Sequence, residues 1–303
     1  MKKTLYYAIA LALALSAAAA HAALNVFSCE PEWQALAQEL GGEKISAYPA
    51  ATSAMQDPHH IQARPSLIAR IRNADLLVCT GAELEIGWLP VLLRQSGNPR
   101  IQPGTRGYLE ASAYVQRLEV PSRVDRAEGD IHPQGNPHIQ TDPRNIALVA
   151  EVLGQRLAEL DPADAGYFRA RHAAFADKWR QAIQRWESEA APLKGMTIVA
   201  HHKEWVYLNR WLGLKELAEL EPKPGVEPTA SHLEELLTTL QHDPAQAVVR
   251  SAYQDPKASD WLAQRAHIPA VMLPYTVGGT PEAKDLYALF DDTIARLKKV
   301  AGH

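Results

Sequence analysis

The stretch PADAGYFRARHAAFADKWRQAIQRWESEAA, residues 162–191, decides how the rest of the chain is organised. Its large apolar side chains recur at spacings of three, four or seven residues, which is the periodicity of one helix face: Phe168, Phe175, Trp179, Ile183 and Trp186. No glycine follows Gly166, and nothing inside the stretch breaks a helix. At 1.5 Å per residue this helix is roughly 43 Å long, longer than one small domain needs. We therefore predict a rigid rod joining two lobes, in preference to two helices split near Ala173-Ala174.

The segments on either side of this rod alternate between strand and helix patterns. Before it, strands are predicted at 24–28, 44–48 and 75–80, and helices at 31–40, 66–74, 82–96 (disturbed at Pro90) and 143–160. The long stretch 97–141 between them is read as a loop. After the rod, strands are predicted at 196–200, 214–220 (irregular), 247–251 and 270–273. Helices are predicted in the segment that ends at 212, from a capping box at Ser231 to about 241, at 256–266 and at 281–300. This alternation predicts an α/β fold of two similar parallel-sheet lobes, residues 23–160 and 193–303, joined by the segment 161–192.

The first 22 residues have the pattern of an export signal. Lys2 and Lys3 give a positive start, an alanine-rich apolar run follows to Ala20, and Ala20-His21-Ala22 is a small-residue cleavage site. The run is short for a membrane span, and no second long apolar stretch follows. We therefore expect an exported, soluble, periplasmic protein that is cleaved near Ala22.

The composition of the mature chain excludes one class of partner. Removing the signal takes away two lysines and leaves 281 residues with 29 basic and 35 acidic side chains, a net charge of −6. A nucleic-acid-binding protein usually carries a basic stripe, and no such stripe is present. A length of 281 residues also favours two domains over one.

Cys29 and Cys79 are the two cysteines of the chain. Both fall near the ends of predicted strands that are neighbours in a parallel sheet, and an oxidising compartment permits a bond between them. Adjacent strands lie about 4.8 Å apart, within the range that a disulfide accepts. A structural disulfide is favoured, with two buried thiols or metal ligation as the alternatives.

Three histidine-bearing segments lie far apart in the sequence, each in a predicted loop. They are Gln-Asp-Pro-His-His at 56–60, Asn-Pro-His at 136–138 and Ala-His-His-Lys-Glu-Trp-Val-Tyr at 200–207. Neutral imidazole is a common ligand of Zn²⁺, which needs three or four ligands to converge. Their spacing is not that of a zinc finger or a His-Glu-x-x-His helix. If they bind one metal ion, the fold must bring them together beyond the carboxyl ends of the strands, where ligands bind in such lobes.

Four motifs in order resemble the solute-binding proteins of zinc and manganese ABC importers. Asp57-Pro58-His59 with Arg64-Pro65-Ser66 is similar to the first ligand loop of that family, and Asn136-Pro137-His138 with Asp142-Pro143 is similar to the second. His202, with Trp205 and Tyr207 after it, is similar to the third. Gly278-Gly279-Thr280 is similar to the glycine-rich turn before the last helix of the family. The resemblance covers nearly the whole mature chain.

The resemblance implies a metal-binding protein with no chemistry of its own. The metal would sit in the cleft between the lobes on His59, His138 and His202, and the protein, a monomer, would deliver it to a membrane ABC permease. Many relatives carry an aspartate before the glycine-rich turn as a fourth ligand, but residues 273–277 contain no carboxylate here. The fourth ligand is then water, or a carboxylate from another loop: Glu204, Glu221 or Glu227. Three imidazoles favour Zn²⁺ over Mn²⁺, although Cu²⁺ and Ni²⁺ also bind imidazole well.

Other assignments remain open on sequence alone. His60 or His201 could replace its neighbour as a ligand or support it, and His132 could also catch metal. Trp205 and Tyr207 are expected to pack around the site. A zinc-dependent hydrolase, in which three histidines activate a water molecule, is one competing function. A two-lobed binding protein for a siderophore or corrinoid is another, although the histidines argue against it.

Overall fold

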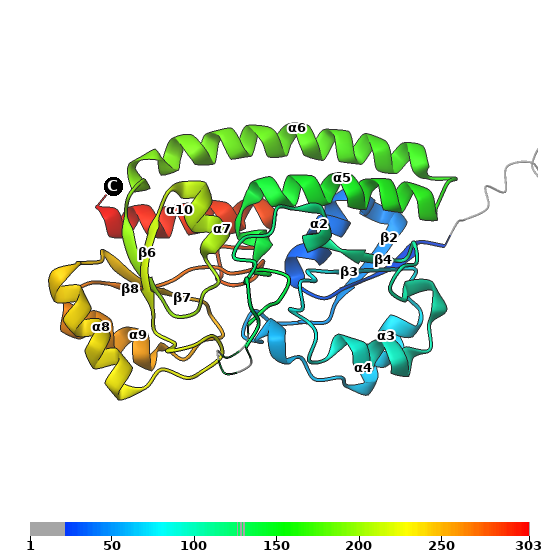
Figure 1. Cartoon of the computed structure of the whole chain (residues 1–303). Coiled ribbons are helices and arrows are strands. Elements are labelled where there is room, and N and C mark those ends of the chain that lie inside the picture. The colour runs from blue at the N-terminus through cyan, green and yellow to red at the C-terminus, as the bar shows by residue number, and fades with distance from the viewer. Residues whose placement is uncertain (1–21, 126, 128, 130, 303) are drawn as a thin grey trace, which may run out of the picture.

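One long helix spans two lobes in the computed structural model, which describes residues 22–302 except 126, 128 and 130. This helix, α6, runs without a break from Ala165 to Ala190 and lies across both lobes (Figure 1). The prediction of a single connecting rod is confirmed. Residues 1–21, which hold most of the expected export signal, lie outside the described residues. Within the described part of the chain, no helix combines the length and apolar character that a membrane span requires.

Each lobe is built on a four-stranded parallel sheet. The strands are β1 (Leu24–Ser28), β2 (Ile45–Pro49), β3 (Leu76–Cys79), β4 (Tyr108–Glu110), β5 (Thr197–Ala200), β6 (Lys215–Glu219), β7 (Ala247–Arg250) and β8 (Ala270–Met272). The first sheet has the order β2-β1-β3-β4 and the second has the order β6-β5-β7-β8, so the two lobes repeat one topology. The predicted irregular strand is β6, where the pairing register with β5 shifts between Ile198 and Val199. The predicted fold class is therefore confirmed.

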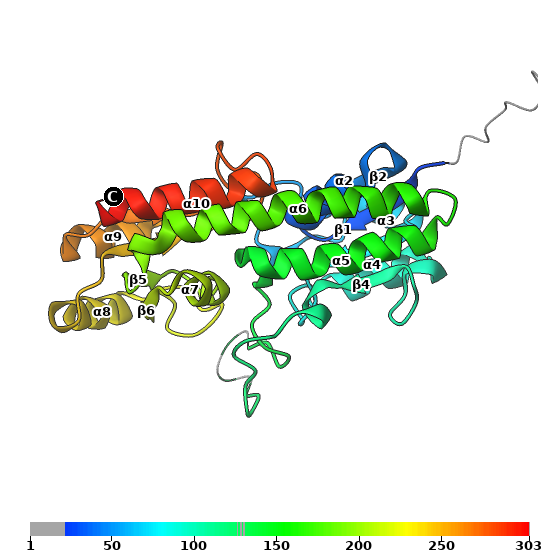
Figure 2. The same ribbon diagram turned by 90° about the horizontal axis from the view of Figure 1, so that it is seen from above.

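The remaining helices pack around the two sheets (Figures 1 and 2). They are α2 (Pro31–Gly41), α3 (Pro65–Arg72), α4 (Leu89–Ser96), α5 (Pro143–Leu160), α7 (Val206–Leu212), α8 (Ala230–His242), α9 (Pro256–Ala266) and α10 (Leu286–Ala301). Figure 2 shows α5 and α10 running beside α6, one from each half of the sequence. Helix α10, the last in the chain, contacts both α6 and α2. The far C-terminal segment thus helps to join the two halves.

The aromatic face of α6 forms the centre of this junction. Trp179 is 1% exposed and stacks on Phe175, with ring centroids 5.1 Å apart. It also meets Phe290 of α10 at 5.7 Å, and its indole Nε1 donates to the Pro143 carbonyl at the start of α5, at 2.8 Å. Trp186 meets Phe290 at 5.0 Å. The periodic apolar residues of the sequence therefore bind α6 to helices of both lobes.

Three expected elements differ in their bounds, and one strand was missed. The helix expected from 82 begins only at Leu89, because Ala82 and Glu83 adopt left-handed backbone angles (φ 51° and 67°) that a helix does not allow. Thr229, not Ser231, caps α8, since its side chain accepts from the His232 amide. Likewise α10 begins at Leu286, behind the capping Asp285. The expected loop 97–141 contains the short edge strand β4, whose three residues are too few for a clear pattern.

The two cysteines form a disulfide, which confirms the favoured interpretation. Cys29 follows β1 and Cys79 ends β3, and their Cα atoms are 4.8 Å apart. Glu85 lies near both sulfur atoms. Because both sulfur atoms are used in the bond, the alternatives of free thiols and of thiolate metal ligation are wrong.

Replacing both cysteines by alanine is expected to lower the free energy of unfolding by roughly 2–4 kcal/mol. The bond joins residues 50 positions apart, so its loss frees a long loop in the unfolded chain. Denaturant unfolding measures this change. An unchanged unfolding free energy would show that the bond contributes nothing to stability.

Candidate metal centre

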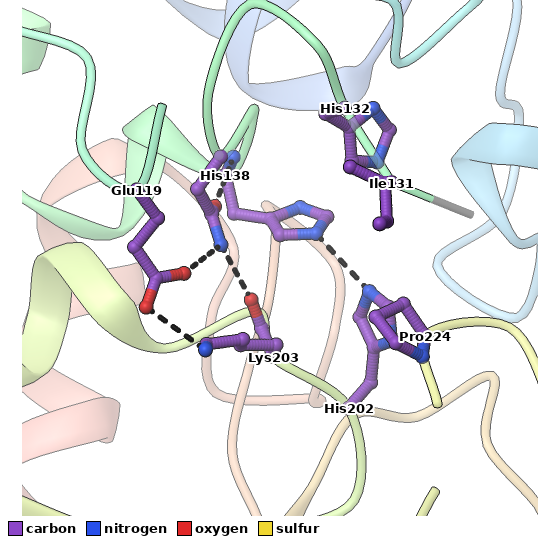
Figure 3. Close-up of a pocket in the computed structure, with 8 residues that line it drawn as sticks. Glu119, Ile131, His132, His138, His202, Lys203 and Pro224 are labelled. Carbon is purple, nitrogen blue, oxygen red and sulfur yellow. Dashed lines mark hydrogen bonds and ion pairs between the residues drawn. The ribbon is translucent and has the colours of Figure 1, made fainter. Parts of the chain in front are cut away.

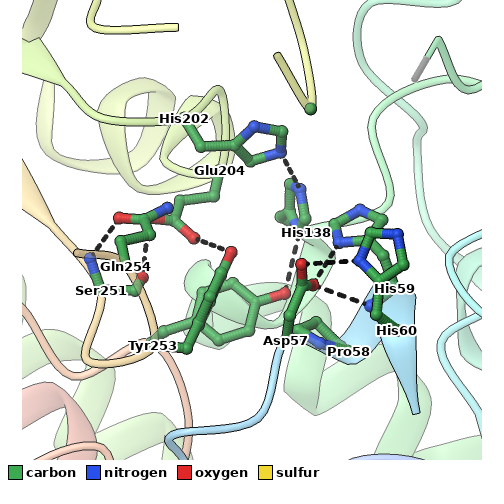
Figure 4. Close-up of polar contacts among 12 residues, drawn as sticks. Asp57, Pro58, His59, His60, His138, His202, Glu204, Ser251, Tyr253 and Gln254 are labelled. Atoms are coloured by element: carbon green, nitrogen blue, oxygen red, sulfur yellow. Dashed lines mark hydrogen bonds and ion pairs between the residues drawn. The ribbon is translucent and has the colours of Figure 1, made fainter. Parts of the chain in front are cut away.

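Three histidines from three distant segments meet where the two lobes face each other. His59 lies in the short 3-10 helix Pro58–His60 after β2, His138 precedes the 3-10 helix Ile139–Thr141, and His202 lies two residues beyond β5. Their ring centroids are 5.4–5.7 Å apart, and one ring nitrogen of each lies within 4.8 Å of the others. Figure 4 shows the three rings gathered at one point. The expected convergence of these residues is therefore present.

The spacing of the ring nitrogens suits a tetrahedral ion. The Nε2 atoms of His138 and His202 are 3.3 Å apart. Two ligands that each bind Zn²⁺ at about 2.0–2.1 Å in tetrahedral geometry are separated by about 3.3–3.4 Å. The Nε2 atom of His59 is buried and has no hydrogen-bond partner among the described residues. The arrangement leaves Nε2 of each ring as the natural donor atom.

A separate group holds the other nitrogen of each ring. The Nδ1 atom of His59 lies 2.8 Å from Asp57 Oδ1, and that of His138 lies 2.8 Å from the Tyr275 hydroxyl. The Nδ1 atom of His202 lies 2.7 Å from Glu221 Oε2. Such partners fix the orientation and tautomer of a metal-binding imidazole, so that the lone pair is on Nε2.

The backbone around each ring is also fixed by local hydrogen bonds. Asp57 caps its short helix by accepting from the His59 amide at 2.9 Å, and Trp88 donates to the Pro58 carbonyl at 2.8 Å. Asn136 accepts from the His138 amide at 3.0 Å. The rings are therefore placed before any ion arrives, which lowers the entropic cost of binding.

The charges around the site favour binding of a cation. Burial, followed by the positive charges that the other histidines can carry, holds the pKa of His138 well below its usual range. Burial alone would lower the pKa of His202, but the hydrogen bond and negative charge of Glu221 outweigh it and raise the pKa. Burial raises the pKa of Asp57 less than His59 and His60 lower it, so its carboxyl stays ionised. The carboxyl groups of Asp57 and Glu221 thus contact the Nδ1 sides of His59 and His202, away from the converging nitrogens.

The carboxylates expected as a fourth ligand lie outside the group of converging nitrogens. Glu204 is fully buried and accepts hydrogen bonds from Ser251 (2.6 Å), Tyr253 (3.0 Å) and Gln254 (3.1 Å), and burial raises its pKa to about 7. Glu221 accepts from the Gly225 amide at 2.8 Å and supports His202. Glu227 lines a cavity that His59 and His202 also line, but it is not in the converging group. In the described residues, the group within 4.8 Å contains three imidazoles and no carboxylate.

The neighbouring histidines take different positions. The His60 side chain is 71% exposed and its Nδ1 atom pairs with Asp57 at 3.0 Å. His201 is buried, and its Nδ1 atom has no partner among the described residues, but it is not in the converging group. The ring of His132 lies 5.4 Å from that of His59. Burial, then the charges of nearby histidines, lowers the pKa of His132 to about 4, so its ring is neutral.

The sequence did not reveal the supporting roles of Tyr275 and Asp57, whereas the expected packing of aromatic residues around the site is present. Tyr275 lies in the stretch 273–277, where a carboxylate was sought, and its contact with His138 spans 137 positions. Asp57 could have been recognised, since an aspartate two residues before a histidine can cap its backbone. Trp205 and Tyr207 are buried beside the site as expected, and the Tyr207 hydroxyl donates to the Asn136 carbonyl at 2.7 Å.

The cavities beside the histidines are small. One of about 180 Å³ is lined by His138, His202 and His132, and Figure 3 shows the side chains around it. A second, of about 250 Å³, lies beside His59 and His201. Organic ligands usually occupy pockets of about 300–1,000 Å³. A siderophore or corrinoid is larger than either space, whereas a metal ion fits.

The model of the family described as "Zinc-uptake complex component A periplasmic" (ZnuA) matches residues 26–300. The chain belongs to the ZnuA family. It is 24% identical over 267 residues to the high-affinity zinc uptake system protein ZnuA of Paracoccus denitrificans (77% of this chain, 78% of the relative). It is 20% identical over 273 residues to the manganese ABC transporter substrate-binding lipoprotein PsaA of Streptococcus pneumoniae (88% and 84%). A crystal structure of ZnuA shares the fold, with a TM-score of 0.76 at 22% identity, covering 92% of this chain and 98% of that one.

Membership of the ZnuA family decides the class of function. The chain is a metal-binding, solute-binding component of an ABC uptake system and not an enzyme. The hydrolase interpretation is therefore not supported. Relatives are periplasmic proteins or lipoproteins, and both zinc and manganese occur in their names, so membership leaves the ion open.

Replacing Glu221 by alanine is expected to weaken zinc binding roughly 10- to 100-fold, as is typical for loss of a group that orients a metal-binding histidine. The His202 ring would lose its 2.7 Å partner and the nearby negative charge. Competition against a fluorescent zinc chelator measures the affinity. Glu235→Ala is the matched control, because that side chain is 78% exposed on α8. Equal affinities for the two variants would contradict a supporting role for Glu221.

Proposed function

We propose that this ZnuA-family chain captures one Zn²⁺ ion on His59, His138 and His202 and delivers it to the permease of its ABC importer. The observation that carries the proposal is the meeting of three Nε2 donors, with a 3.3 Å spacing between two of them. Each ring has a partner on Nδ1, so all three can bind as neutral imidazoles. The ion is cargo, and its release requires no covalent step.

The donor set favours zinc over manganese. Mn²⁺ prefers carboxylate and water oxygen, whereas Zn²⁺ binds well to three or four nitrogen donors. The carboxylates nearest the site, Asp57 and Glu221, are directed at the Nδ1 atoms of His59 and His202. Cu²⁺ and Ni²⁺ also bind imidazole. Discrimination against them must come from the tetrahedral arrangement of the donor atoms and from which metal ions are available to the protein.

A competition experiment tests this proposal. The purified protein is stripped of metal, offered equal zinc, manganese, copper and nickel, and analysed for its elements. We expect one zinc per chain and little manganese. His59→Ala, His138→Ala and His202→Ala should each lose most of the zinc, while His242→Ala, on the exposed end of α8, should keep it. Undiminished zinc in all three site variants would reject the site, and preferential manganese loading would reject the choice of ion.

The cellular context and domain division follow from the same proposal. The chain is exported, cleaved after Ala22 and released as a soluble periplasmic monomer. Its lobes are residues 23–160 and 193–303, joined by 161–192. The contacts of α10 with α6 and α2 support a tight junction rather than independent lobes. Mass spectrometry of the exported protein, with an N-terminus at Ala23, and light scattering at the monomer mass of the mature chain check these points.

A further inference from the structure

The fourth coordination position of the proposed zinc ion needs an occupant, because Zn²⁺ in a protein is usually four-coordinate. Three carboxylates near the histidines already have hydrogen-bond partners, while Glu227 lines the same cavity as His59 and His202. Asp57 holds His59 and His60, and Glu221 holds His202 and the Gly225 amide. Glu204 is bonded to three other side chains. Use of Asp57 or Glu221 as a ligand would break a contact that positions a ring.

His132 is a fourth imidazole at the edge of this group. Its ring centroid lies 5.4 Å from that of His59 and 6.4 Å from that of His138, while the three converging rings are 5.4–5.7 Å apart. Its Nε2 atom is buried and has no hydrogen-bond partner among the described residues, as is also true of His59 Nε2. The ring lies beside the Ala82 backbone. His132 therefore shares with His59 an unused buried nitrogen close to the converging rings.

The backbone near His132 is tied to the segments that carry the other ligands. The His132 carbonyl accepts from the Gly135 amide at 3.0 Å. The next residue, Asn136, donates through its side chain to the Lys203 carbonyl at 2.7 Å, beside His202, and accepts from the His138 amide. His132 also lines the same cavity as His138 and His202 (Figure 3). The ring nitrogens of His132 lie outside the group of ligand atoms within 4.8 Å, so binding to an ion held by the other three requires this ring to move toward it.

We propose that His132 is the fourth ligand of the bound zinc ion, which then has four imidazole donors and no carboxylate. This inference rests on the proposed function of the other three histidines. It makes His132 part of the binding site.

X-ray absorption at the zinc edge tests the proposal, because scattering from the imidazole ring counts the histidines bound to zinc. We expect four imidazoles in the zinc-loaded protein. In His132→Ala the zinc ion should have three imidazoles and one oxygen donor. This variant should bind zinc roughly 10- to 100-fold more weakly, which is the loss seen when a group that orients a metal-binding histidine is removed. His242→Ala is the matched control, and the unfolding free energy of each metal-free variant checks folding.

The outcomes separate this inference from the proposed function. Three imidazoles in both the unaltered protein and His132→Ala, with equal affinities, would overturn a ligand role for His132 while leaving the three-histidine site intact. Zinc binding that survives both His138→Ala and His132→Ala would instead overturn the site as a whole.

Discussion

Replacing His138 by alanine is expected to weaken zinc binding by about 100-fold or more. Zinc sites in small folded domains contribute about 10–16 kcal/mol, or roughly 3 kcal/mol for each of four ligands, and about 1.4 kcal/mol corresponds to a tenfold change in affinity. His138 is 1% exposed and central, since its ring meets those of both His59 and His202. Competition with chelators of graded affinity measures the loss.

The variant Tyr275→Phe separates ligation from support. It removes the hydroxyl that lies 2.8 Å from His138 Nδ1 but leaves the imidazole in place. Its effect should be smaller than that of His138→Ala, within the roughly 10- to 100-fold range of supporting groups. If the two variants lose the same affinity, His138 acts through its surroundings and not as a ligand.

Replacing Trp179 by alanine is expected to lower the free energy of unfolding by roughly 3–5 kcal/mol, the usual cost of removing a buried aromatic side chain. The change leaves a cavity where α6 meets α10, and it removes the indole that donates to the Pro143 carbonyl at 2.8 Å. Urea unfolding of the metal-free protein measures the loss. Tyr114→Ala is a suitable control, because Tyr114 is 41% exposed.

Trp179→Ala should also affect the metal site. Helix α5 begins at Pro143, five residues after His138. The hydrogen bond from the Trp179 indole to the Pro143 carbonyl therefore fixes the backbone just after the segment that carries His138. Zinc affinity should therefore fall with stability, although less than in His138→Ala. A variant as stable as the Tyr114→Ala control would show that the aromatic face of α6 is not the junction of the lobes.

Much of the fold could be predicted because its signals are local. Periodic aromatic residues predicted α6, and α5 and α9 lie where their patterns place them. The start of α4 was missed because the left-handed backbone at Ala82 and Glu83 is set by the surrounding structure and not by side-chain propensity. Strand β4 was missed because three residues at a sheet edge leave almost no periodicity.

The candidate site was likewise predicted only in part. Proline-histidine motifs identified His59 and His138, the aromatic residues that follow it identified His202, and the structure brings the three together. The contact of Tyr275 with His138 could not be derived, and Glu221 was expected only as a possible ligand and not as the partner of His202, since these contacts join residues 137 and 19 positions apart. The position of His132 beside His59 is also a product of tertiary structure, because 73 positions of chain separate the two.

The most direct test of one zinc ion shared between the two lobes is a crystal structure of the zinc-loaded protein with anomalous scattering at the zinc edge. We predict one strong peak per chain, about 2.0–2.1 Å from the Nε2 atoms of His59, His138 and His202. A peak bound to only one lobe, or the absence of a peak among these rings in a protein that carries zinc, would contradict the account.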